Sequence, residues 1–89
     1  MVWNIKYDPR ALKGLKKIDK TAQNRIVSFF DTDLAFLDNP RVRGKSLRGK
    51  FKGLWRYRIG DYRAICHIED KTITIIVLEV GHRKHVYDE

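Results

Sequence analysis

The sequence predicts an α+β fold with the element order β-α-α-β-β-β, in which a helical hairpin packs on one face of a mostly antiparallel sheet. Three observations predict it: an alternating apolar segment near the N-terminus, two stretches of helical periodicity after it, and three strand-like segments in the second half. The chain has 89 residues without internal repeats or a linker, so residues 1–89 are expected to form one domain.

The first predicted element is a strand over residues 2–7, because its apolar side chains alternate and so share one face. A helix should begin at Asp8 and Pro9, since Asp is a good N-cap and Pro is favoured at the first helical position. The apolar stripe of this helix consists of Leu12, Leu15 and Ile18.

A second helix is expected to be capped by Asp19 or Thr21. It should end at Asn39, because the residue before Pro40 is biased away from the helical region. Its apolar residues are Ala22, Ile26, Phe29, Phe30 and Leu37. The two helices are therefore predicted to form a hairpin.

The most informative segment begins at Trp55, where apolar and cationic residues alternate with the period of a β-strand. Trp55, Tyr57 and Ile59 should face one way, while Arg56 and Arg58 face the other. The apolar side of this strand is expected to belong to the core.

The strand should turn at Gly60 and Asp61, because Gly supplies the positive φ of a type II′ hairpin turn. Closing the hairpin there pairs Arg58 with Arg63 and gathers Arg56, Arg58 and Arg63 on one face. Like charges placed so close repel each other unless a polyanion binds there. The pattern therefore predicts a phosphate-binding site.

Two segments flank this hairpin. Residues 41–53 are basic and rich in glycine, which indicates a loop or a weak strand. Residues 73–80 are so apolar that they should form a strand covered on both faces, central in the sheet, which Gly81 would break.

The chain is strongly basic, with 19 Lys and Arg against 11 Asp and Glu and a formal charge of +8. Such an excess favours association with nucleic acid or another acidic surface. The single cysteine suits a reducing compartment, and three scattered histidines argue against a zinc site, so no metal or cofactor is expected. Neither a signal peptide nor a membrane span is visible, which predicts a cytoplasmic protein without membrane association.

Three motifs in order, Leu47–Gly49, Gly53–Arg63 and Gly81–Tyr87, resemble the RelE/StbE group of toxins in the RelE/ParE superfamily. The resemblance covers essentially the whole chain and includes the order of its elements. It implies that the sheet is curved and that the protein is a ribosome-dependent endonuclease, which cleaves mRNA in the ribosomal A site by metal-free attack of the ribose 2′-hydroxyl. Its partners would be the ribosome with its rRNA and mRNA, and a RelB-like antitoxin that forms a heterotetramer with it. Operator DNA would be contacted only through the antitoxin.

The resemblance also implies roles for individual residues. Arg63 matches the phosphate-binding arginine of the family, and guanidinium suits phosphate because it donates two parallel hydrogen bonds and stays charged. Arg83 matches a second arginine, which would lie near the leaving oxygen. Tyr87 matches a late tyrosine that would stack on the substrate base, orient it or take part in proton transfer.

Arg56 and Arg58 stand where some members of the family have lysine. Arginine is a poor general base, so these residues would stabilise charge rather than remove a proton. The base could be Tyr87, His82 or His85, and the sequence leaves this choice open.

Further cations could contact ribosomal or messenger RNA through its phosphates, which positions a protein without reading sequence. The candidates are Lys13, Lys17, Lys45, Arg48, Lys50 and Lys52. Two other functions stay open: a ParE-like inhibitor of DNA gyrase with the same fold, and a non-catalytic RNA-binding module. The gyrase-directed relatives generally lack the set Arg63, Arg83 and Tyr87, which argues against the first.

Overall fold

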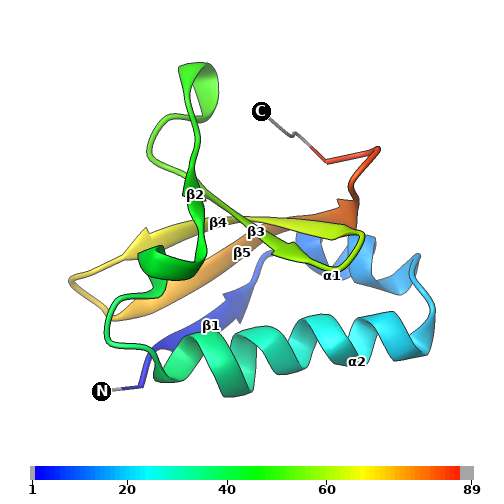
Figure 1. Ribbon diagram of the computed structural model, residues 1–89, viewed down its shortest axis with the longest axis horizontal. Coiled ribbons are helices and arrows are strands. Elements are labelled where there is room, and N and C mark those ends of the chain that lie inside the picture. Colours follow the sequence, from blue (N-terminus) through cyan, green and yellow to red (C-terminus); the bar gives the residue numbers. More distant parts are fainter. Residues whose placement is uncertain (1, 87–89) are drawn as a thin grey trace.

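In the computed structural model of this protein, the structure describes residues 2–86. Helices α1 (Pro9–Lys16) and α2 (Lys20–Ser28) pack on a five-stranded mixed sheet of order β1-β5-β4-β3-β2 (Figure 1). The strands are β1 (Asn4–Tyr7), β2 (Lys45–Ser46), β3 (Trp55–Ile59), β4 (Tyr62–Glu69) and β5 (Thr74–His82). Strand β1 pairs with β5 in parallel and all other pairs are antiparallel, which confirms the predicted fold class.

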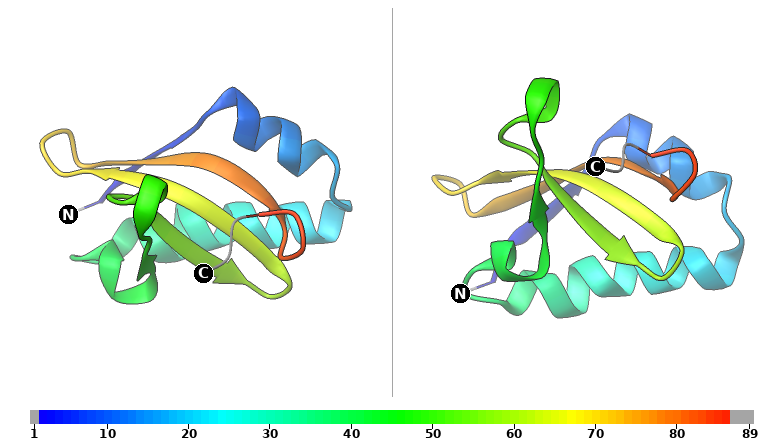
Figure 2. Two further views of the ribbon diagram at one scale, coloured as in Figure 1. Left: turned by 90° about the horizontal axis from the view of Figure 1, so that it is seen from above. Right: turned by 45° about the horizontal axis from the view of Figure 1, so that its top comes forward.

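Both helices cover the same face of the sheet. Ala11 and Leu15 of α1, and Ile26 of α2, belong to one buried cluster with Tyr57 and Val77 of the sheet. Figure 2 shows the curvature of β4 and β5 over the helical layer. The structure thus confirms the helical hairpin and the curved sheet.

Side chains cap both helices as predicted. The Asp8 carboxylate accepts a hydrogen bond from the amide of Arg10 at 3.0 Å, and the Asp19 carboxylate accepts one from the amide of Ala22 at 3.4 Å. These bonds satisfy amide groups that have no partner inside the helix.

The second helix is less regular than the sequence predicts. After Ser28 it widens into a π-turn at Phe29–Asp33 and then tightens into a 3₁₀ turn at Leu34–Phe36, so Leu37 lies beyond it. The adjacent residues Phe29 and Phe30 both pack on Tyr57, with ring centroids 5.8 Å and 6.0 Å away. The widened turn accompanies the burial of two consecutive aromatic rings.

In α1 the buried positions differ from the predicted stripe. Leu12 is 46% exposed, and Ala11 lies fully buried in its place. The cause is the close approach of α1 to β5, since a Cβ atom at Gly14 would overlap the carbonyl oxygen of Val80. No side chain fits between the helix and the strand at Gly14.

The last strand continues further than predicted. Strand β5 runs through Gly81 to His82, so the expected break at Gly81 is wrong. Gly81 pairs with Arg63 of β4, and a Cβ atom at this glycine would lie 2.9 Å from Cγ2 of Val86. Gly81 therefore makes room for Val86, and the chain turns only after His82, whose carbonyl accepts from the amide of His85 at 2.8 Å.

A second, smaller cluster covers part of the other face of the sheet. Leu47, Ile65 and Val86 are buried there, and Phe51 and Leu54 pack against them. Residues 47–54, which we call the arm, project from the sheet beyond β2 and contain a short 3₁₀ turn (Figure 1). Only Lys45–Ser46 of the basic segment 41–53 pair with β3. The segment is therefore mainly a loop, for which the sequence indicates a loop or a weak strand.

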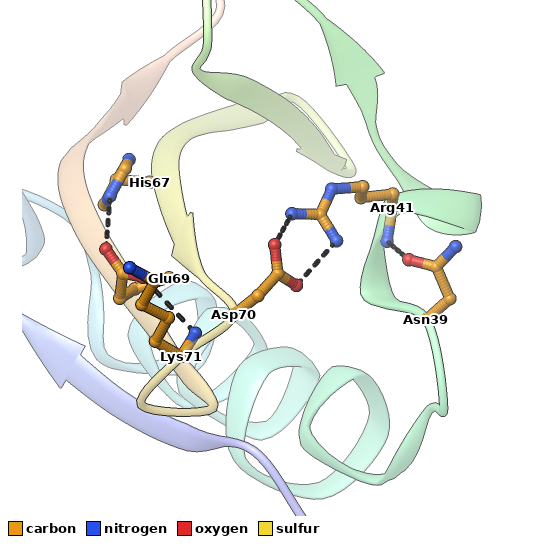
Figure 3. Close-up of polar contacts among 6 residues, drawn as sticks. All are labelled: Asn39, Arg41, His67, Glu69, Asp70 and Lys71. Atoms are coloured by element: carbon orange, nitrogen blue, oxygen red, sulfur yellow. Dashed lines mark hydrogen bonds and ion pairs between the residues drawn. The ribbon is translucent and has the colours of Figure 1, made fainter.

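Polar contacts lie at the turn between β4 and β5, the end of the sheet that is far from Arg63 (Figure 3). The Arg41 guanidinium donates to both oxygens of Asp70, at 3.1 Å and 2.7 Å, and it holds the pKa of that carboxyl below its usual value. At this end, Nε2 of His67 lies 3.6 Å from Oε2 of Glu69. These residues stand at the far end of β4 from Arg63, so they belong to the scaffold.

Removing the hydroxyl of Tyr57 should cost stability. Tyr57 is fully buried, and its hydroxyl donates to the carbonyl of Pro40 at 2.8 Å. Tyr57→Phe leaves that buried oxygen without its donor, so we expect a loss of about 1–2 kcal/mol in the free energy of unfolding, measured by urea denaturation. Tyr7→Phe is the control, because its hydroxyl donates to Asp31 at 3.3 Å at the surface. Equal losses in the two variants would contradict the prediction.

Candidate anion-binding site

The β3–β4 hairpin has the predicted register. Arg58 pairs with Arg63, and Tyr57 pairs with Ala64. Gly60 has a φ of 61° and is the residue of the two-residue turn with positive φ, as a type II′ turn requires. The prediction from the alternating pattern is therefore confirmed at this hairpin.

The three arginines of the hairpin share the face of the sheet that points away from the helices. Arg56 and Arg63 are 4% and 6% exposed, while Arg58 is open to solvent. The Arg63 guanidinium donates through Nη1 to the carbonyl oxygens of Gly60 at 3.1 Å and of Tyr62 at 3.0 Å. The hairpin turn thus fixes the orientation of the Arg63 guanidinium.

The turn also places a fourth arginine. The backbone amide of Arg83 donates to the carbonyl oxygen of Asp61 at 2.9 Å. Burial lowers the pKa of Arg63, and the charges of Arg58, Arg56 and Arg83 lower it further. We call Arg56, Arg58, Arg63 and Arg83 the arginine cluster. An anion bound there would relieve this repulsion, and phosphate matches the donors of guanidinium.

The structure places His82 away from the arginine cluster. His82 pairs with Tyr62, so both side chains lie on the helical face of the sheet, with ring centroids 5.8 Å apart and planes at 85°. The His85 ring lies 6.3 Å from the His82 ring. His82 also accepts a hydrogen bond at Nδ1 from the amide of Lys84, at 3.3 Å. The predicted Tyr87 lies outside the described residues.

The six further cations form two groups. Lys13 and Lys17 are exposed at α1, whereas Lys45 lies in β2 and the other three lie in the arm. The Lys50 ammonium stands 5.5 Å from the centroid of the Phe51 ring. One group therefore borders the helices and the other borders the face that carries the arginine cluster.

Sequence reasoning missed a cleft of about 740 Å³ between α1 and residues 79–86, which we call the α1 cleft. Its polar lining includes Arg10, Lys13, Lys17, Tyr62, His82 and His85. Sequence reasoning also missed Val86, which packs over Gly81. The two walls of the cleft are more than sixty positions apart along the chain, so no local pattern could have indicated it.

Among residues 2–86, no group of three or more His, Cys, Asp or Glu side chains is arranged to hold a metal ion. In the same range, no helix is long and apolar enough to span a membrane. Cys66 is buried opposite Trp55, and burial raises the pKa of its thiol.

The family model for the ParE toxin of the type II toxin-antitoxin system, parDE, matches residues 5–87. Toxin RelG of Mycobacterium tuberculosis is 30% identical, with 98% of each chain covered. The mRNA interferase toxin RelE of Escherichia coli K12 is 28% identical over 100% of this chain and 94% of that protein.

Two solved structures of toxin–antitoxin complexes contain chains that are similar to this one. The toxin–antitoxin complex RelBE2 of Mycobacterium tuberculosis contains a chain with a TM-score of 0.86 and 29% identity, over 93% of each chain. The archaeal RelE–RelB complex of Pyrococcus horikoshii contains one with a TM-score of 0.72 and 27% identity, over 97% of this chain and 100% of that one.

Proposed function

Since this chain belongs to the ParE toxin family of type II toxin–antitoxin systems, in the RelE/ParE superfamily, we propose that it is a ribosome-dependent mRNA endonuclease. The observation that carries the proposal is the arginine cluster, in which Arg56, Arg58 and Arg83 lie close enough to Arg63 for their charges to lower its pKa. The relative RelE of Escherichia coli, named an mRNA interferase toxin, supports the same reaction class.

Cleavage of RNA without a metal ion requires that the ribose 2′-hydroxyl lose a proton, that the charge on the phosphorane be stabilised, and that the leaving 5′-oxygen be protonated or neutralised. We assign Arg63 to the scissile phosphate, because its guanidinium is held rigidly by the turn carbonyls of Gly60 and Tyr62. Arg83 is anchored to the same turn through its backbone and would lie at the leaving oxygen.

Arg56 and Arg58 add positive charge beside Arg63 and would stabilise the phosphorane. The candidates for the general base are Tyr87, His82 and His85. His82 and His85 line the α1 cleft on the other side of the sheet from Arg63. Their position favours Tyr87 as the base.

The test is a cleavage assay with purified protein. Ribosomes programmed with an mRNA are incubated with the protein beside the naked mRNA, and primer extension maps the cuts. We expect cuts within the A-site codon only when ribosomes are present. Intact mRNA in both reactions would contradict the proposal.

A second candidate is inhibition of DNA gyrase, and the match to a ParE family model is the observation that favours it. This candidate predicts loss of gyrase supercoiling activity in the presence of the protein and no cut in mRNA. A non-catalytic RNA-binding module would instead bind ribosomes and leave both mRNA and gyrase activity unchanged.

We further propose that a RelB-like antitoxin neutralises this toxin in the cytoplasm, in a heterotetramer that reaches operator DNA through the antitoxin alone. The named complexes of the structural neighbours support such a partner, since each pairs a RelE chain with a RelB chain. Co-purification with the product of the adjacent open reading frame tests this partnership, and recovery of the toxin alone would contradict it.

A further inference from the structure

We propose that the α1 cleft is a second subsite for the RNA backbone, separated from the arginine cluster by the turn at residues 82–86. Lys13 and Lys17 on one wall, with His82 and His85 on the other, would contact phosphates of the same strand that binds Arg63. This inference rests on the proposed function for the identity of the bound strand.

The walls of the cleft bring cationic and imidazole groups together from two distant segments. Lys13 lies in α1 and Lys17, four positions later, is its C-cap, so both project from the same side of the helix. His82 and His85 stand opposite them at the end of β5. The floor is formed by backbone at Gly14 and nearby β5 residues, because the helix lies directly on the strand there.

Two acidic residues, Glu79 and Asp19, also line the cleft. The carboxylate of Glu79 lies 3.7 Å from the guanidinium of Arg10, and that of Asp19 caps α2 at the amide of Ala22. The cations of the cleft still outnumber its acids by one, with Arg10, Lys13 and Lys17 against Glu79 and Asp19. A surplus of positive charge favours an anionic ligand.

The cleft continues the arginine cluster around the edge of the sheet. Tyr62 and Arg63 are consecutive in β4, so their side chains point to opposite faces, one into the cleft and the other toward the arginines. The turn at residues 82–86 also contributes residues to both sides. His82 and His85 lie on the cleft side, and the charge of Arg83 lies close to Arg63. Figure 2 shows this turn wrapping around the end of β5.

This continuity favours RNA over an acidic peptide. A phosphodiester backbone carries one charge per nucleotide and can follow cations along a curved path. The aromatic ring of Tyr62 offers a base an apolar surface in the cleft. A peptide would bind in the cleft independently of the arginine cluster. If the cleft binds RNA, the effect of cleft variants on affinity should depend on RNA length, whereas a peptide site predicts no such dependence.

The experiment measures binding of RNA that carries 2′-O-methyl groups and cannot be cleaved. Fluorescence anisotropy is recorded with oligonucleotides of about 4 and about 16 nucleotides, the range of single-strand site sizes. Lys13→Ala/Lys17→Ala is compared with Lys16→Ala/Lys20→Ala. The control pair removes the same charge from exposed positions of the same helical hairpin that do not line the cleft.

We expect Lys13→Ala/Lys17→Ala, the cleft variant, to bind the long RNA about tenfold more weakly than Lys16→Ala/Lys20→Ala, the control variant. Its dependence of log affinity on log salt should be shallower by about 0.7 for each phosphate that the variant no longer neutralises. Binding of the short RNA should be equal in the two variants, because the arginine cluster alone holds it. His85→Gln, which removes an imidazole without changing the lysines, should also weaken only the long RNA.

Equal affinity of the cleft and control variants for the long RNA would overturn the proposal. So would a loss confined to binding of a polyglutamate peptide, which would make the cleft a peptide site. The assay contains neither ribosomes nor cleavable RNA, so its result is independent of whether the protein cuts mRNA. Circular dichroism of each variant shows whether the fold is intact.

Discussion

Arg63→Ala is expected to reduce cleavage in the A-site assay by at least about a hundredfold, the scale seen when a donor to a developing negative charge is removed. The physical reason is that Arg63 is the arginine whose guanidinium the hairpin turn orients and around which three further positive charges gather. Expression of the variant in cells should be harmless, and binding of the antitoxin should be retained.

Controls separate this effect from a change in net charge or in folding. Arg43→Ala removes the same charge from an exposed 3₁₀ turn that lies outside the arginine cluster, and it should cleave like the unchanged protein. Arg83→Ala should also lose activity, and it should fold normally because the side chain is exposed and only its backbone binds Asp61. Full toxicity of either the Arg63 or the Arg83 variant at equal expression would refute the assignment.

Gly14→Ala is expected to destabilise the protein by about 3 kcal/mol, since overpacking at this contact forces helix and strand apart. At an exposed helical position, the same change would stabilise a protein by about 1 kcal/mol, because alanine has the higher helix propensity. The carbonyl oxygen of Val80, which occupies the place of the new Cβ atom, reverses the sign. Such a loss is a large fraction of the stability of a small domain.

Urea denaturation measures the change, with Lys16→Ala as the control from the same helix. Lys16 is exposed, so its replacement should change the free energy of unfolding by less than about 0.5 kcal/mol. A Gly14→Ala variant as stable as the unchanged protein would show that α1 can move away from β5 at little cost. In that case the walls of the α1 cleft would not be fixed.

The elements that could be predicted are those whose signals are local. Asp8 and Asp19 cap the two helices because capping involves residues only two or three positions apart. The end of the second helix was less predictable, since its π-turn accompanies the packing of Phe29 and Phe30 on Tyr57. Tertiary contacts override helical periodicity there.

The sequence by itself determined the hairpin and the gathering of Arg56, Arg58 and Arg63. Alternation assigns each residue to a face, and a glycine with positive φ sets the register, so both are properties of neighbouring residues. Only the tertiary structure decided that β5 passes through Gly81 and that His82 faces away from the arginines. It alone formed the α1 cleft, because contacts between α1 and the end of β5 join segments that are distant in the sequence.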